Sequence, residues 1–146
     1  MGVMGVLRIA GSALTAQRLR MDVTSSNIAN AETTTSPEGG PYRRTRVVFA
    51  PVVDAPLPSD MGSQRAPALG NGVQVRDVVR DQTDPRRVYE PAHPDADADG
   101  YVSMPNVDLV TEMTDMLAAS RAYEANVTTI NVAKSMAQRA LDIGRI

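Results

Sequence analysis

Apolar residues recur with helical spacing at the start of the chain. In residues 3–30 the apolar positions are separated alternately by four and three residues, and no proline interrupts them. This spacing places one apolar stripe along a helix, as in the seam of a coiled coil. The stripe consists of Val3, Leu7, Ala10, Leu14, Gln17, Met21, Thr24 and Ile28. The pattern predicts a helix, although Gly5 and Gly11 each weaken it by about 1 kcal/mol relative to alanine.

A second proline-free segment, residues 106–144, has the same spacing. Pro105 precedes it, and Asn106 is the expected helix cap with Asp108 in the first turn. Gly144 is suited to end the helix. The apolar stripe consists of Leu109, Met113, Met116, Ser120, Tyr123, Val127, Ile130, Lys134, Ala137 and Leu141. Such a helix extends roughly 55–60 Å, more than a small domain needs, so we expect part of it to contact a partner.

The middle of the chain, residues 31–105, holds all ten prolines and cannot form a long helix. Two β-branched runs, 45–53 and 73–79, predict strands. Turn signals flank them at 39–41 and 70–72. Residues 56–68 read as a loop, and no motif defines the fold of residues 55–85.

These elements predict an α+β fold, in which long N- and C-terminal helices pair as a coiled coil and a small β-rich insertion lies between them. Residues 1–30 and 106–146 would form a terminal helical domain, and 31–105 a middle domain with long loops. Two helices alone bury little area. We therefore expect the terminal helices to be weakly ordered in a lone subunit and to become ordered by packing against neighbours.

Composition excludes several classes of function. The chain has no cysteine, so disulfides and thiolate metal sites are excluded. The formal net charge is −2 and no basic stripe occurs, which argues against nucleic-acid binding and permits identical chains to associate. Residues 1–16 lack the basic start and unbroken apolar run of a secretory signal, so we expect no cleaved signal peptide.

An acidic segment is the strongest candidate for metal chemistry. Three aspartates at alternate positions precede a glycine: Asp95, Asp97, Asp99 and Gly100. This arrangement matches the first half of a calcium loop, but the twelfth position, which requires glutamate, is Asn106. A tight turn whose carboxylates accept hydrogen bonds from nearby amides is therefore the preferred interpretation. A calcium-binding interaction module using Asp95–Asp99 is the alternative.

Catalysis has little support in the sequence. His93 is the single histidine and lies in a proline-rich segment, without a cysteine nucleophile or a Gly-x-Ser-x-Gly elbow elsewhere. A small hydrolase using His93 is thus a second, weaker alternative. We expect no catalytic residue and no cofactor.

Polar residues crowd the end of the first predicted helix: Asn27, Asn30, Thr33, Thr34 and Thr35. Capping needs only one or two of them, so the others predict an ordered polar contact with another chain. A short basic cluster follows at residues 43–46 and is expected to be exposed charge at a strand edge. Asp115 is expected to be a surface carboxylate.

Several segments resemble the flagellar basal-body rod proteins. The N-terminal signature is AQRLR at 16–20 followed by SNIANAETT at 26–34. PYRR at 41–44 and YEPAHPDAD at 89–97 narrow the resemblance to the proximal-rod type, and GYV at 100–102 and PNV at 105–107 extend it. SRAYEANV at 120–127 and ALDIG at 140–144 complete it.

The resemblance implies a structural subunit whose terminal helices polymerise into the inner tube of a helical rod that transmits torque. The rod would belong to the basal body and cross the periplasm, and its subunits would leave the cytoplasm through the flagellar export apparatus without a cleaved signal. Implied partners are other rod proteins, the rod base at the membrane ring and further copies of the chain, with no nucleic acid and no small-molecule substrate. The residues expected to contact other subunits are Val3, Leu7, Leu14, Met21, Asn27, Ile28, Asn30, Thr33, Thr34, Leu109, Met113, Met116, Tyr123, Asn126, Val127, Ile130 and Leu141.

Overall fold

The computed structural model describes residues 2–37, 39–52 and 71–143. The elements in chain order are α1 (Val3–Ala29), β1 (Thr45–Pro51), β2 (Val73–Arg80), β3 (Arg86–Tyr89), β4 (Tyr101–Met104) and α2 (Leu109–Ile143). The α+β class, the two long helices and the two predicted strands are confirmed. The loop expected at 56–68 lies outside the described residues.

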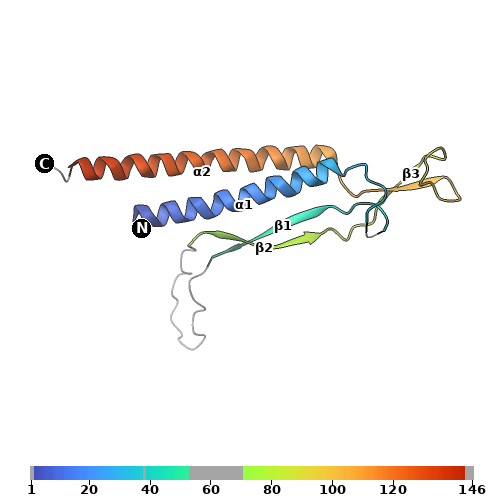
Figure 1. Cartoon of the computed structure of the whole chain (residues 1–146), viewed down its shortest axis with the longest axis horizontal. Helices are drawn as coiled ribbons and strands as arrows, with labels where there is room; N and C mark the ends of the chain where they lie inside the picture. The colour runs from blue at the N-terminus through green and yellow to red at the C-terminus, as the bar shows by residue number, and fades with distance from the viewer. Residues whose placement is uncertain (1, 38, 53–70, 144–146) are drawn as a thin grey trace, which may run out of the picture.

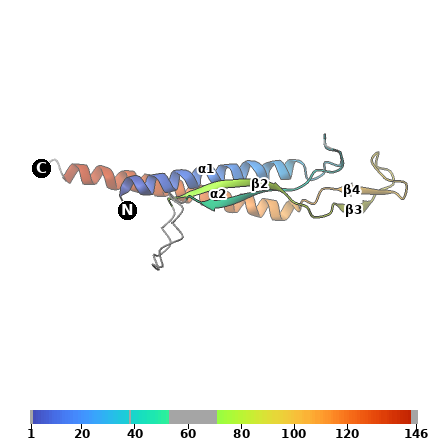
Figure 2. The same cartoon turned by 90° about the horizontal axis from the view of Figure 1, so that it is seen from below.

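The molecule is elongated, with α1 lying between α2 and the β1–β2 hairpin (Figure 1). The two helices run in opposite directions side by side. α2 has 35 residues and α1 has 27, so α2 extends past the start of α1 at the end where both chain termini lie. The β3–β4 hairpin projects at the opposite end, beyond the helix pair (Figure 2). The helix pair is therefore covered by strands on one side only.

The β1–β2 hairpin carries one irregularity. The strands are antiparallel with Val47 opposite Val78, and the register shifts between Val48 and Phe49. The shift leaves Arg76 without a partner across the pair, which is the arrangement of a β-bulge. A bulge increases the local twist of a strand pair and helps the hairpin follow the surface of α1.

Gly72 and Ser12 join the hairpin to α1. The Val73 N–H donates a hydrogen bond to Ser12 Oγ at 3.1 Å, and Ser12 Oγ donates to the Ile9 carbonyl at 2.7 Å. Gly72 has a φ of +132°, and a Cβ at this position would lie 2.4 Å from Ser12 Oγ. Glycine is therefore required here for both its backbone conformation and its lack of a side chain.

The sequence did not predict the β3–β4 hairpin, because its strands are only four residues long and lie among prolines. Tyr89 lies opposite Tyr101, and their rings pack edge to face at 5.3 Å. Gly100 turns the chain with a φ of +80°, and a Cβ there would lie 2.9 Å from the Tyr89 ring. Val102 in β4 is completely buried.

The apolar core of the described residues is made of small side chains. Its buried members are Ala10, Ala16, Val102, Ala119 and Ala133. Alanines at a helix contact allow two helix backbones to approach closely, but each buries little area. No helix in the described part of the chain combines the length and apolarity needed to cross a membrane.

Candidate assembly surface

The face of α2 that packs on α1 differs from the predicted stripe in half of its positions. Met116, Tyr123 and Ile130 lie on the inner face as predicted, and all three are partly buried. The positions between them are filled by Glu112, Ala119, Asn126 and Ala133, whereas Met113, Val127 and Lys134 are exposed and Ser120 is partly buried beside Ala119. The alternating spacing of four and three residues was predicted correctly. Of the two interleaved sets of positions, the set that contains Met113 was predicted one residue too late along the helix. Ala119 and Ala133 are small side chains that let the two helices pack closely, and Met116, Tyr123 and Ile130 fill the positions between them.

Several of the larger apolar residues of α2 are consequently left exposed. Val110 is 72% exposed and Met113 is 55% exposed. The exposed large apolar residues of α2 are Leu109, Val110, Met113, Leu117, Val127, Val132, Met136 and Leu141. Extended exposed apolar surfaces mark sites of protein association, so the described part of α2 is the candidate for such a site.

The predicted positions of α1 are mostly half-buried, because this helix is covered on two sides. Leu7, Leu14, Met21 and Ile28 are partly buried, and Val3 is exposed near the start of the helix. The fully buried residues of α1 are Ala10, Ala16, Thr24 and Asn27. The apolar surface open to neighbours therefore lies mainly on α2.

Asn27 is buried and is hydrogen bonded entirely within the subunit. Its Nδ2 donates to the Thr45 carbonyl at 2.8 Å and to Glu112 Oε2 at 2.9 Å. Its Oδ1 accepts from the Tyr42 hydroxyl at 2.9 Å and from the Thr45 N–H at 3.0 Å. All four bonds that a primary amide side chain can make are present. Asn27 thus ties together α1, β1 and α2.

Arg44 and Glu112 extend this buried cluster. The Arg44 guanidinium contacts the Glu112 carboxylate, which is 1% exposed. Asp115 accepts from Arg20 Nη2 at 2.8 Å and lies 3.4 Å from Arg44 Nη2. One sequence prediction was wrong here, because Arg44 is not free strand-edge charge; Asp115 does lie at the surface, with its side chain 36% exposed, but it is paired with two arginines. Arg44 and Asp115 both bind the helices to the start of β1.

Asp108, not Asn106, caps the start of α2, where its carboxylate accepts a hydrogen bond from the Val110 N–H at 3.3 Å. The Thr111 hydroxyl donates to the Asp108 carboxylate, and this hydrogen bond lowers the pKa of Asp108 below its usual value of 3.8. Asn106 instead accepts from the Arg44 N–H at 2.8 Å and donates to the Thr83 carbonyl at 3.2 Å. Asn106, the predicted cap, therefore links the residue before β1 to the segment between β2 and β3.

The polar residues after α1 reach the acidic turn. Asn30 donates to the Ser26 carbonyl at 2.8 Å and accepts from Thr33 at 3.2 Å, and so closes the end of α1. The Thr34 hydroxyl donates to Asp95 at 2.6 Å, which lowers the pKa of that carboxyl. These residues also remain partly or largely accessible at the surface.

The acidic turn has the structure expected from local hydrogen bonding. Asp97 Oδ1 accepts from the N–H groups of Tyr101 at 2.9 Å and Asp99 at 3.0 Å, and Asp97 Oδ2 pairs with Arg87 at 2.7 Å. The hydrogen bond from Tyr101 is the main reason that the pKa of Asp97 is lowered. Within the described ranges, no three His, Cys, Asp or Glu side chains are grouped as a metal site requires. Nothing in this geometry supports the calcium-binding alternative.

His93 belongs to the same turn. The His93 ring Nδ1 accepts a hydrogen bond from the backbone N–H of Asp95 at 3.1 Å. The backbone N–H of His93 donates to the Glu90 carbonyl at 3.1 Å. Both interactions shape the backbone, so the turn explains the position of His93 without any reaction.

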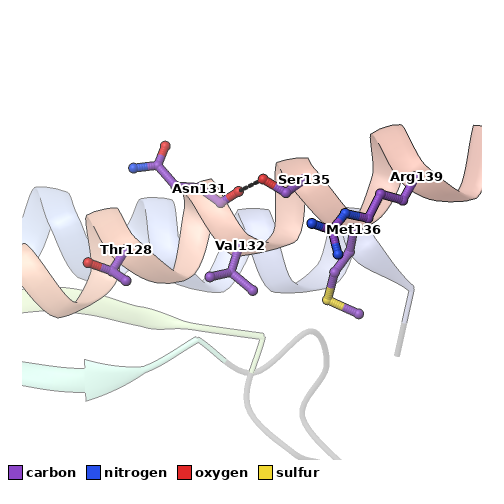
Figure 3. Close-up of a pocket in the computed structure, with 6 residues that line it drawn as sticks. All are labelled: Thr128, Asn131, Val132, Ser135, Met136 and Arg139. Atoms are coloured by element: carbon purple, nitrogen blue, oxygen red, sulfur yellow. Dashed lines mark hydrogen bonds between the residues drawn. The ribbon is translucent and has the colours of Figure 1, made fainter.

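A shallow apolar groove lies where α2 passes the start of α1. It measures about 350 Å³ and is lined by Val3, Val6, Thr128, Thr129, Val132, Ala133 and Met136. Figure 3 shows the adjoining surface of α2, where Val132 and Met136 lie on one side of the helix and the Arg139 side chain lies close to Met136. The predicted stripe contained none of these α2 residues, because they lie off its four-three spacing.

Comparison with known proteins identifies relatives over almost the whole chain. The family described as "Flagella basal body rod protein" matches residues 7–35, and the family described as "Flagellar basal body rod FlgEFG protein C-terminal" matches residues 98–143. A protein of Borreliella burgdorferi (strain B31) named "Flagellar basal-body rod protein FlgC" is 48% identical over 98% of each chain. Proteins of the same name from Escherichia coli O6:H1 and Bacillus subtilis (strain 168) are 47% and 46% identical, over 99% and 95% of this chain and 100% and 96% of theirs.

Proposed function

Since this chain belongs to the FlgC family of flagellar basal-body rod proteins and is a structural subunit of the proximal rod, we propose that it polymerises through its terminal helices and transmits torque. The observation that carries this proposal is the division of α2 into two faces. Alanines pack on α1, and larger residues such as Met113 remain exposed. Burying each such side chain at a subunit contact contributes about 1.5–3 kcal/mol, which offsets the entropy lost on ordering.

The residues proposed to contact other subunits fall into two groups. The first is the exposed apolar surface of the helices, with Val3, Leu109, Met113, Val127 and Leu141. The second is partly buried within the subunit and would contribute only its accessible atoms: Leu7, Leu14, Met21, Ile28, Asn30, Thr33, Thr34, Met116, Tyr123, Asn126 and Ile130. Asn27 would act from the interior by holding the helices in register.

Torque transmission requires a subunit that does not deform when its neighbours push on it. The Asn27–Glu112–Arg44 cluster ties both helices to β1, and Thr34–Asp95 ties the end of α1 to the acidic turn. We propose that the terminal helical domain, residues 1–30 and 106–146, and the middle domain, residues 31–105, move as one body under load, which these cross-links support.

The subunit belongs to the flagellar basal body and assembles with other flagellar rod proteins. We further propose contacts with copies of itself, with the rod base at the membrane ring and with the export apparatus. In this proposal the rod crosses the periplasm, and the subunit is exported without a cleaved signal peptide. The subunit would act mechanically and turn over no substrate.

Complementation tests the proposal directly. Cells whose own copy of this gene is deleted should swim in soft agar when they express the wild-type chain. Their purified basal bodies should contain the chain, and electron cryomicroscopy should trace its helices in the rod wall. Basal bodies with a complete rod but without this chain would overturn the proposal.

A further inference from the structure

The helix pair carries two separate apolar features at its opposite ends. Near the β3–β4 hairpin, the ridge consists of Val110, Met113 and Leu117, which lie at i, i+3 and i+7 and are each more than half exposed. Near the chain termini, the groove contains Val132 and Met136, which are also more than half exposed. One feature is a row of projecting side chains and the other is a hollow, so they are complementary in shape.

We propose that the ridge of one copy seats in the groove of a second copy. This inference rests on the proposed function and specifies the surfaces through which copies of the chain contact each other. The two features are different surfaces of the same molecule. A contact between different surfaces is heterologous, and repeating it gives a ring if the rotation closes and an open helical assembly if successive copies are displaced along the axis.

Charge also favours a second copy as the occupant. Glu124 lies seven residues after Leu117 of the ridge, and Arg139 lies seven residues after Val132 of the groove. Seven residues are about two helical turns, so each charge lies on the same side of α2 as its apolar residue. Both charged side chains are exposed. Seating Leu117 of one copy against Val132 of the next places Glu124 opposite Arg139.

The same pairing sets the stagger of the two copies. Leu117 and Val132 are 15 residues apart, as are Glu124 and Arg139. At 1.5 Å per residue, parallel α2 helices in this contact are displaced by about 22 Å along their axes. One displacement satisfies both the apolar and the charged pair.

Charge reversal provides the first test. In cells that lack their own copy, Glu124→Arg and Arg139→Glu should each cause loss of swimming, because each places like charges together at every repeat of the contact. The double variant E124R/R139E should restore swimming. Failure of the double variant to restore it, or normal swimming of both single variants, would overturn the inference.

Disulfide cross-linking provides the second test, since the chain has no cysteine of its own. The double variant Leu117→Cys/Val132→Cys cannot form a disulfide within one α2, because its two sulfurs are separated by about 22 Å. Oxidised basal bodies should therefore yield a ladder at multiples of the 15.6 kDa chain. No adduct, or an adduct with a different protein, would exclude a second copy from the groove.

The control pairs Leu117→Cys with Thr15→Cys, which lies exposed on α1 outside the groove. It should give no ladder, and a ladder of equal strength would overturn the inference. Failure of the proposed function gives a different result. The wild-type chain would then be absent from purified basal bodies, whereas failure of the ridge-and-groove contact leaves it present.

Discussion

Glu112 on α2 accepts a hydrogen bond from Asn27 on α1 at 2.9 Å, across 85 residues of sequence. Both side chains are 1% exposed, and Arg44 provides the positive charge that balances the buried carboxylate. Only one alignment of the two helices and β1 brings these groups together. Buried polar groups of this kind can fix the register of a helix pair, because every other register leaves them without partners.

The first prediction concerns this cluster. Asn27→Ala removes four hydrogen bonds and leaves the buried Glu112 with fewer donors, so it should lower the free energy of unfolding by about 2–4 kcal/mol. Urea unfolding of the isolated chain, followed by circular dichroism, measures the change. Asn131→Ala, an exposed asparagine of α2, is the matched control and should change little. Equal stability of the Asn27 and Asn131 variants would show that the cluster does not hold the helices.

The second prediction separates two roles of glycine. Gly72→Ala should destabilise the subunit, because Cβ would lie 2.4 Å from Ser12 Oγ at a φ of +132°. Gly11→Ala should stabilise it by about 1 kcal/mol, because Gly11 lies in the interior of α1 and nothing lies within 4 Å of a Cβ placed there. Thermal unfolding of both variants tests this contrast. A stable Gly72→Ala variant would mean that the β2–α1 contact is not tight.

Helical spacing and strand-forming runs were enough to predict both helices and the β1–β2 strands. Spacing could not decide which residues face α1, because Met113 and Glu112 are adjacent and only the polar partners Asn27 and Arg44 select Glu112 for the interior. The same limit hid the role of Glu112, since a charged residue on a helix is expected to be in water unless its partner is known. Arg44, its partner, comes from a segment 68 residues away.

The third prediction concerns the pH dependence of the acidic turn. The pKa of Asp97 is lowered from 3.8 by the Tyr101 N–H, with a contribution from Arg87. The folded state therefore prefers the carboxylate, and its contribution to stability is full above the unfolded pKa of 3.8. The contribution is lost as pH falls through the lower folded pKa. Asp97→Asn should thus lower the melting temperature at neutral pH, and the difference from wild type should shrink below pH 3.8.

Melting curves from neutral pH to about pH 3 check this expectation. Asp22→Asn changes an exposed carboxylate on α1 and should follow the wild-type profile. A constant difference between Asp97→Asn and wild type at every pH would show that ionisation of Asp97 does not stabilise the turn.

The fourth prediction concerns order in the lone subunit. The Asn27–Glu112 cluster and β1 hold one end of the helix pair, whereas the other end contains the groove, Gly5 and Gly11, and the part of α2 that extends past α1. Hydrogen exchange of the verified monomer should show the strongest amide protection near Asn27 and Glu112 and the weakest in the outer turns. Uniform strong protection along both helices would contradict ordering by neighbours.

The last prediction compares the two faces of α2. Met113→Asp places a charge at a position that is 55% exposed, so it should change the free energy of unfolding by less than about 0.5 kcal/mol. In the rod the same charge would be buried in a subunit contact without a partner, which should abolish motility.

Ala119→Asp places a charge in the completely buried contact with α1 and should lower the stability of the monomer itself by about 3 kcal/mol or more. Ala118→Asp, exposed beside the ridge, is the control for added charge and should be tolerated. Unfolding curves and soft-agar swimming distinguish the three variants, and a motile Met113→Asp strain would show that the outer face of α2 is not an assembly surface.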